Sequence, residues 1–362
     1  MCKNIFLLTI ALCFSVLAFA NMASPINPGT ISSSAISSKN INITSENIFI
    51  KINKDFTTAK YIVEYNIQSN VAGKQMPLLF YAKDYKDNFM VWVDNKPVSV
   101  KSLSELNIDQ SSFLKLYENG NDSTKVAISF DRNERASYEI NDLKYFEIDV
   151  EKGNHVIRVE YVAKAWIDKS DWVKKYSFHY SLSPAKYWQS FSNLTIKIEQ
   201  EGSVKNYTTN LGLPNENKIS NLHTWNFKNL PSDFITINFQ PKPNTLVAFL
   251  ISLEPFGIAV IFSIILMLLH LYWVIWYRRK NISKKFSAPV IIGSFLVPFL
   301  YLFIYINSYS VIDNIIGKDA SNWHGYYVLI IIFYPFILIA YWVVFWLIDK
   351  LYKRKLLSKQ VD

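Results

Sequence analysis

The sequence predicts two regions of different fold class: an all-β extracytoplasmic domain, an antiparallel β-sandwich, followed by a three-helix α transmembrane region. Three observations lead to this prediction. Residues 41–240 alternate apolar and polar side chains, the last third holds three long apolar stretches, and the first twenty residues have the composition of a secretory signal. A period of two is typical of half-buried strands, and apolar stretches of about 20 residues are typical of membrane-spanning helices.

The N-terminal segment, residues 1–20, is predicted to be a cleaved signal peptide. Lys3 supplies the basic region, residues 5–17 form the apolar region, and Ala18-Phe19-Ala20 provides the small residues that precede cleavage. The alternative is an uncleaved fourth membrane helix, which the short apolar run disfavours. We therefore expect the mature chain to begin after residue 20.

The only two cysteines, Cys2 and Cys13, fall inside this segment. Without them the mature chain can form no disulfide, cysteine nucleophile or cysteine-based metal site. The extracytoplasmic domain must then be stabilised by its own core, which a length of about 200 residues allows.

The domain itself is predicted to cover residues 41–240, after a flexible Ser-rich leader at 21–40. Alternating runs such as 61–67 and 157–163 are separated by turn signals, and we count nine to twelve of them. Short antiparallel strands with one wet face and regular turns are typical of a sandwich.

Three transmembrane helices are predicted in the last third of the chain. The predicted segments are a linker or interfacial segment at 241–255, helices at 256–276, 286–306 and 326–348, connections at 277–285 and 307–325, and a tail at 349–362. Glu254-Pro255 interrupts the apolar run at 245–253, which is either interfacial or a kinked extension of the first helix.

Basic residues fall on alternate sides of these helices. Five lie in or beside the first connection and five in the tail, whereas the second connection holds only Lys318. Basic loops stay in the cytoplasm, so we expect the β-domain outside and the C-terminus inside, in a bacterial cytoplasmic membrane. Much of the net charge of +9 flanks the helices, which argues against nucleic acid as a partner.

No catalytic or metal-binding motif is present in the sequence. His155, His179 and His223 lie on different predicted strands without metal-ligand spacing, so we expect neither a metal site nor a cofactor. Asp168 and Asp171 flank a lysine-rich stretch, which we interpret as a solvated turn rather than an acid–base pair.

Two groups of residues remain as candidate sites. Tyr187, Trp188 and Phe191 are too close together for all three to point inward, and they are predicted to form part of a binding surface. His270 and Glu254 are ionisable residues of the membrane region, where such groups are functional candidates. Structural roles are the alternative in both cases.

The sequence thus favours a membrane protein whose outer β-domain binds a protein or envelope component, with the lipid bilayer and further membrane or envelope proteins as partners. Three helices exceed what an anchor requires, which suggests a larger complex. An extracytoplasmic enzyme or small-ligand binder, and an accessory subunit of a transporter or sensor, are the alternatives.

Overall fold

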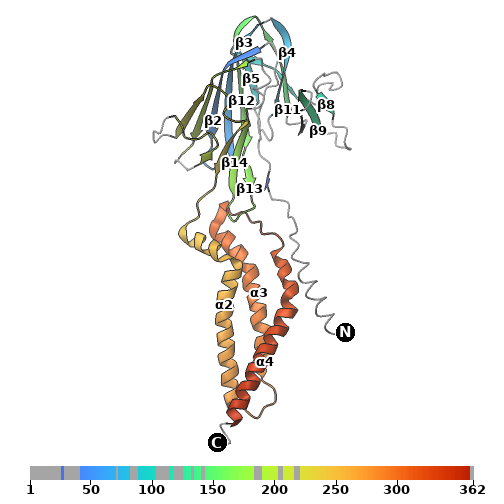
Figure 1. The fold of residues 1–362 in the computed structure, drawn as a ribbon, viewed down its shortest axis with the longest axis vertical. Coiled ribbons are helices and arrows are strands. Elements are labelled where there is room, and N and C mark those ends of the chain that lie inside the picture. Colours follow the sequence, from blue (N-terminus) through green and yellow to red (C-terminus); the bar gives the residue numbers. More distant parts are fainter. Residues whose placement is uncertain are drawn as a thin grey trace. The chain divides into compact units, whose positions relative to one another are not determined.

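Strands fill the first two thirds of the chain and helices the last third (Figure 1). The computed structural model describes residues 26–27, 41–70, 72–81, 89–102, 114–116, 125–131, 134–139, 143–182, 190–202, 207–215 and 221–358. The chain divides into a β-rich unit, residues 26–168 and 175–240, and a helical unit that contains residues 169–174 and everything from Pro241 onward. The two units are described separately below.

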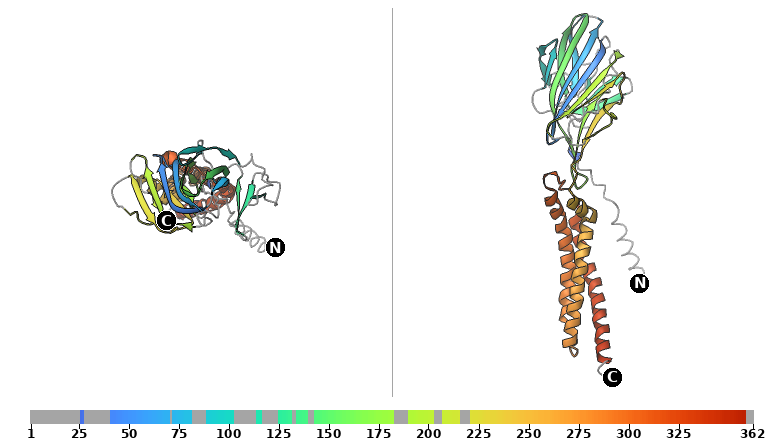
Figure 2. Two further views of the ribbon diagram at one scale, coloured as in Figure 1. Left: turned by 90° about the horizontal axis from the view of Figure 1, so that it is seen from above. Right: turned by 90° about the vertical axis from the view of Figure 1, so that its left-hand side faces the viewer.

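The main sheet of the β-rich unit is built around three strands of 12 residues each, which lie side by side in Figure 2. Its order is β18 (Leu222–Phe227), β16 (Leu194–Gln200), β2 (Ile41–Ile52), β3 (Thr58–Ser69), β12 (Gly153–Lys164), β5 (Met90–Val93) and β6 (Lys96–Val98), with β15 (Ser190–Phe191) also paired to β2. Buried and accessible residues alternate along β3, as the period of two predicts. Asp94 and Asn95 form the two-residue turn between β5 and β6, and both have positive φ, as a type I′ hairpin requires.

Three smaller sheets complete the unit. The first contains β1 (Ile26–Asn27), β13 (Trp166–Asp168), β14 (Lys175–Ser181), β19 (Phe234–Phe239) and β17 (Thr208–Thr209). The second contains β4 (Gly73–Tyr81), β11 (Leu143–Val150) and β7 (Val100–Ser102). The third contains β10 (Glu134–Glu139), β9 (Lys125–Asp131) and β8 (Leu114–Leu116). The prediction of an antiparallel sandwich is confirmed only in part, because most strand pairs are antiparallel but β2 pairs in parallel with both β15 and β16. A β-rich region of mixed sheets describes this unit, and the two antiparallel layers of a sandwich are not evident in it.

Tyrosines from different sheets stack in the core of this unit. The rings of Tyr61 on β3 and Tyr161 on β12 lie 4.8 Å apart, and Tyr180 on β14 lies 6.0 Å from Tyr61. Tyr180 donates a hydrogen bond of 3.0 Å to the buried carboxyl group of Glu46, and its hydroxyl lies 2.9 Å from that of Tyr65. Burial raises the pKa of Glu46 to about 7, although the hydrogen bonds from the tyrosines oppose this shift.

Within its described residues, the helical unit contains three helices long and apolar enough to cross a membrane, which confirms the predicted three-helix region. They are α2 (Thr245–Lys280), α3 (Ala288–Ile316) and α4 (Tyr334–Ser358), with 3₁₀ turns η5 (Gly317–Asp319) and η6 (Tyr327–Phe333) between the last two. The chain is therefore a membrane protein. Within α2, Glu254 has a positive φ of 56° before Pro255, so 245–253 forms a helical turn kinked against the remainder.

Candidate functional site

The predicted aromatic binding surface is only partly described by the structure. Tyr187 and Trp188 lie outside the described residues. Phe191 lies on β15, where it is half-buried and packs against the main hydrophobic core. Its position agrees with a structural role, whereas the binding role of the three residues stays a prediction.

His270, predicted as a functional candidate in the membrane region, has a partner on each ring nitrogen. Its Nε2 lies 3.0 Å from the carbonyl oxygen of Pro289 and its Nδ1 3.0 Å from the Tyr341 hydroxyl. A carbonyl can only accept, so Nε2 carries a proton, and in the neutral ring Nδ1 accepts from the Tyr341 hydroxyl. The ring also stacks on Phe345 at 4.2 Å, and it thereby joins all three helices.

Glu254, the second candidate in the membrane region, is exposed at the kink of α2. Glu254 and His270 lie at different levels of the same helix and are not brought together by the structure. The candidate site that the structure does reveal lies at the C-terminal end of α3.

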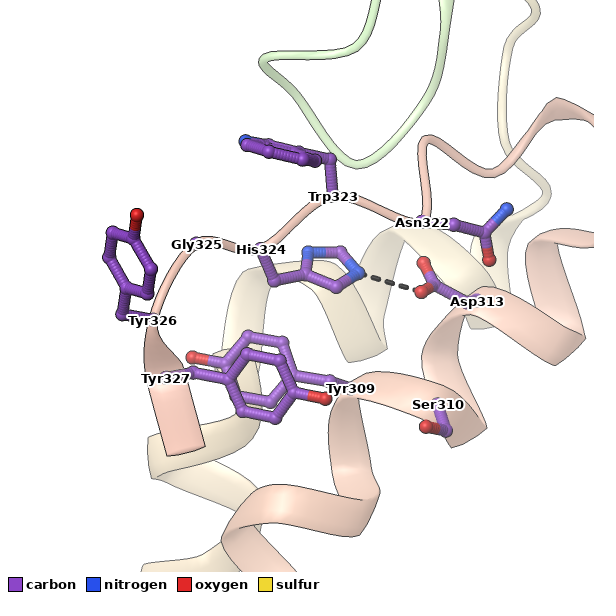
Figure 3. Close-up of a pocket in the computed structure, with 9 residues that line it drawn as sticks. All are labelled: Tyr309, Ser310, Asp313, Asn322, Trp323, His324, Gly325, Tyr326 and Tyr327. Carbon is purple, nitrogen blue, oxygen red and sulfur yellow. Dashed lines mark hydrogen bonds and ion pairs between the residues drawn. The ribbon is translucent and has the colours of Figure 1, made fainter. Parts of the chain in front are cut away.

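A pocket of about 470 Å³ lies where α3 ends and the chain turns towards α4 (Figure 3). One turn of α3 and the following connection line it, through Tyr309, Ser310, Asp313, Asn322, Trp323, His324, Gly325, Tyr326 and Tyr327. Four of these residues are aromatic, one is acidic, and none is Lys or Arg. Gly325 has a positive φ of 65°, a conformation that suits glycine and lets the connection turn into η6.

The buried polar group of the pocket is the pair formed by Asp313 and His324. The Nε2 atom of His324 lies 2.7 Å from Asp313 Oδ2, and each side chain is only 10% exposed. The other carboxylate oxygen, Asp313 Oδ1, is buried and has no hydrogen-bond partner among the described residues. A buried acceptor without a donor costs about 1–3 kcal/mol, so this oxygen requires an explanation.

Aromatic rings surround the histidine. Tyr309 and Tyr327 stack with their centroids 4.1 Å apart, and the His324 ring lies 5.0 Å from Tyr309 (Figure 3). Trp172 lies 4.3 Å from the His324 ring and 5.6 Å from Tyr309. His324 therefore packs beside aromatic rings from separate segments of the chain.

Trp172 directly follows the predicted solvated turn, in which Ser170 and Asp171 are exposed. Residues 169–174 pack with the helical unit, where Val173 forms a β-bridge with Ala320. The backbone N–H of Lys174 donates to Asp319 at 2.9 Å, and that of Ser321 donates to the carbonyl of Trp172 at 3.0 Å. Buried backbone groups favour such pairing, and an isolated sequence segment gives no sign of the partner strand.

Asp313 and His324 were missed by sequence reasoning. Asp313 lies seven residues beyond the predicted end of the second helix, so it was assigned to a solvated connection instead of the membrane region. The usable signal was the extension of the apolar pattern through Ile312, Ile315 and Ile316, which carries the helix past this aspartate.

The Asp313–His324 pair has no serine partner among the described residues. A histidine held by a carboxylate can act as a base towards a nucleophile. Ser310, however, lies on α3 away from the pair in Figure 3 and has no hydrogen bond to either residue in the described part of the chain. The residues described by the structure also contain no group of three or more His, Cys, Asp or Glu side chains suited to a metal ion.

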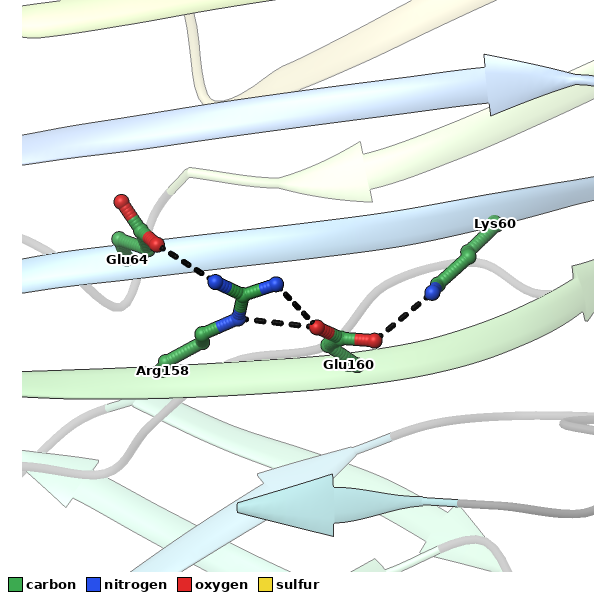
Figure 4. Close-up of polar contacts among 4 residues, drawn as sticks. All are labelled: Lys60, Glu64, Arg158 and Glu160. Carbon is green, nitrogen blue, oxygen red and sulfur yellow. Dashed lines mark hydrogen bonds and ion pairs between the residues drawn. The ribbon is translucent and has the colours of Figure 1, made fainter. Parts of the chain in front are cut away.

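Charged side chains of the β-rich unit form a separate row across β3 and β12 (Figure 4). Arg158 contacts Glu160 and lies 3.2 Å from Glu64, while Lys60 lies 2.8 Å from the other oxygen of Glu160. Burial opposes ionisation of Glu160, but hydrogen bonds from Lys60 and Arg158 hold its pKa below the usual value. Opposite charges on neighbouring strands stabilise the sheet, so this row has a structural explanation.

The three histidines of the β-rich unit lie apart from one another. His155 lies 2.7 Å from Asp94, and His223 lies 2.5 Å from the Tyr207 hydroxyl. His179 packs beside Trp166, and burial lowers its pKa. The structure thus gives each histidine its own environment and brings none of them to the pocket in the helical unit.

Comparison with known proteins gives no family. No protein-family model matches the chain, and no curated protein does. A candidate nutrient-binding protein from Legionella pneumophila is 14% identical over 59% of this chain and 72% of its own, with a TM-score of 0.41. An M1 zinc metallopeptidase from Deinococcus radiodurans (6% identical, 56% and 43% covered, TM-score 0.29) and LTA4 hydrolase from yeast (9%, 61% and 32%, 0.30) are also similar. The chain spans less than half of either enzyme, and similarities this weak identify neither a fold nor a function.

Proposed function

We propose that this chain is a multi-pass protein of a bacterial cytoplasmic membrane whose β-rich domain, on the extracytoplasmic side, binds a protein or envelope component within a membrane complex. The observation that carries this proposal is the placement of residues 169–174. They follow β13 and precede β14 in the chain, yet they belong to the helical unit and pack there against Ala320 and His324. A passive anchor requires no such contact, so we infer that the helices take part in the function of the domain.

The orientation follows from charge. Arg279, Lys280, Lys284 and Lys285 gather where α2 ends and α3 begins, and further basic residues lie at the end of α4. Basic segments remain in the cytoplasm. Residues 21–240 precede the first spanning helix and would then lie outside, as would the connection that contains the pocket.

Cysteine labelling tests this orientation. In a Cys2→Ser, Cys13→Ser background, Asn95→Cys in the β5–β6 turn and Ser283→Cys in the α2–α3 connection both offer exposed positions. A membrane-impermeant maleimide should label the first in intact spheroplasts and the second only after lysis. Labelling of Ser283→Cys in intact spheroplasts would refute the orientation.

Site-specific photo-crosslinking in living cells tests the binding role. The photoreactive residue is placed at three exposed apolar positions of the β-rich unit, Val156, Leu222 and Phe234, and at the exposed polar Asn95 as a control. We expect a light-dependent adduct with one envelope component at an apolar position and none at Asn95. Trp172→Ala should lower the yield of that adduct without changing membrane insertion. Identical patterns at all four positions would contradict the proposal.

A further inference from the structure

The pocket at the end of α3 has the features of a binding site for a positively charged organic group. Asp313 is 8% exposed as a whole residue, lines the pocket, and has one oxygen without a donor among the described residues. The other oxygen pairs with His324, so the buried Oδ1 is the oxygen whose acceptor capacity is unused in the described residues (Figure 3). An acceptor of this kind is completed by a donor or a cation.

The walls of the pocket narrow the choice of ligand. Tyr309, Trp323, Tyr326 and Tyr327 present aromatic rings, whose faces attract cations. No Lys or Arg lines the pocket, and the carboxylate repels anions, which disfavours phosphate or carboxylate ligands. A volume of about 470 Å³ is in the range of small organic ligands.

A metal ion fits this lining less well than an organic cation. Calcium takes six to eight oxygen ligands. Among the residues that line the pocket, only Asp313, Ser310 and Asn322 offer non-aromatic side-chain oxygens, and Ser310 lies away from the Asp313–His324 pair in Figure 3. The aromatic rings that line the pocket favour an organic cation, whose carbon atoms can pack against them.

We propose that this pocket binds a primary ammonium group, with an N–H of the ammonium donating to Asp313 Oδ1 and its carbon stem lying against the aromatic rings that line the pocket. A quaternary ammonium has no N–H and would leave the oxygen unpaired. The ammonium group can come from a soluble alkylamine or from the ethanolamine headgroup of a membrane lipid, since both present the same chemistry. This proposal does not depend on the partner of the β-rich domain.

Ligand-observed NMR on the full-length protein in mild detergent tests the chemistry. Butylammonium is the probe, and tetramethylammonium and butanol are the matched controls that lack the N–H or the charge. We expect saturation transfer from aromatic protons to butylammonium and at least tenfold weaker binding of both controls. Equal binding of butylammonium and either control would overturn the proposal.

Two variants locate the site. Asp313→Asn removes the charge at constant shape and should weaken butylammonium binding by about 10- to 100-fold, the effect of losing a charge-assisted hydrogen bond. Tyr326→Leu changes a side chain that is 71% exposed, so folding is preserved, and should weaken binding by about two- to fivefold. Asp319→Asn, an acid at the same end of the helices that does not line the pocket, is the control and should bind as the wild type does. Wild-type affinity in Asp313→Asn would overturn the proposal.

The source of the ammonium group is identified by native mass spectrometry of protein released from nanodiscs of mixed phosphatidylethanolamine and phosphatidylcholine. Retention of phosphatidylethanolamine by the wild type and its loss in Asp313→Asn would assign a lipid headgroup. Retention that does not depend on Asp313, together with Asp313-dependent butylammonium binding, would assign a soluble amine. If neither ligand depends on Asp313, the proposal is wrong.

Discussion

Two buried aspartates of the helical unit show how the same side chain serves two purposes. Asp349 on α4 receives Arg278 Nε at 2.8 Å on one oxygen and Arg278 Nη2 on the other. Asp313, near the C-terminal end of α3, receives His324 on one oxygen and has no partner on the other among the described residues. The side chain of each is about one tenth exposed.

The difference lies in how completely each charge is compensated. Arg278 is 1% exposed, and its third nitrogen donates to the carbonyl of Lys284 at 2.8 Å, so the bidentate pair is closed on all sides. It fastens α2 to α4 and offers nothing to a ligand. Asp313 faces a pocket with half of its hydrogen-bonding capacity unused, and this incompleteness marks it as a binding group.

The largest expected effect comes from breaking the closed pair. Asp349→Asn leaves the Arg278 guanidinium buried without a counter-charge, which should lower the free energy of unfolding by about 3–5 kcal/mol. Unfolding of the full chain in mild detergent with increasing SDS measures this. Arg279→Ala, one residue along, removes an exposed cation that contacts Tyr352 and should change the midpoint far less. Equal shifts in the two variants would show that the pair is not a clamp.

Glu46 in the β-rich unit extends the comparison to a third buried acid, one compensated by tyrosine hydroxyls instead of a cation. Its pKa is about 7 when folded, above the ordinary value of 4.5, because burial disfavours the charge. The folded state then holds a proton that the unfolded state releases. The stabilisation is complete below pH 4.5 and is lost as the pH rises to about 7, by about 3 kcal/mol in total.

Glu46→Gln should therefore abolish this pH dependence. The variant should match the wild type near pH 4.5 and exceed it in stability at pH 8, because glutamine accepts from Tyr180 without a charge. Chemical unfolding of the full chain at several pH values measures the difference, with the exposed Glu201→Gln as a control. A wild-type slope in Glu46→Gln would contradict the assignment.

An intermediate effect is expected where Gly293 of α3 faces His270 of α2. A Cβ atom added at Gly293 would overlap His270 Nε2, so the ring would have to give up its hydrogen bond to Pro289. Gly293→Ala should cost about 1–3 kcal/mol through overpacking. Gly257→Ala is the matched control, because its added Cβ would meet Leu253 at an ordinary 3.6 Å. If Gly293→Ala leaves the free energy of unfolding unchanged, α2 and α3 can move apart at no cost in stability.

The sequence predicted the two-part architecture because both periodicities are local. Alternation along β3 and the apolar length of α2, α3 and α4 are set by neighbouring residues. It did not predict the parallel pairing of β2 with β16, since strand partners far apart in the chain leave no local signal. This parallel pairing is why the structure matches the predicted antiparallel sandwich only in part.

The candidate site was harder to predict for the same physical reason. Trp172, Tyr309 and His324 come from separate segments, and each alone has an ordinary explanation as an aromatic or polar residue of a connection. Arg278 was likewise counted among the cytoplasmic charges that set topology, whereas it is buried against Asp349, 71 residues away. Local sequence patterns predict where helices and strands lie. The role of a buried charged residue such as Arg278 depends on a partner that is distant in the sequence.

The smallest expected effect on stability is also the sharpest test of the comparison. Asp313→Asn makes the same chemical change as Asp349→Asn, at similar burial and in the same unit. Asparagine still accepts from His324, and it removes a buried charge whose second oxygen had no donor, so the loss and the gain nearly cancel. We expect a change within about 1 kcal/mol in either direction, against the loss of about 3–5 kcal/mol at position 349.

Both variants are measured side by side in the SDS unfolding assay. A loss at position 313 as large as that at 349 would mean that Asp313 is a structural clamp, whereas a near-neutral result shows that the fold does not need its charge and leaves that charge free for a ligand.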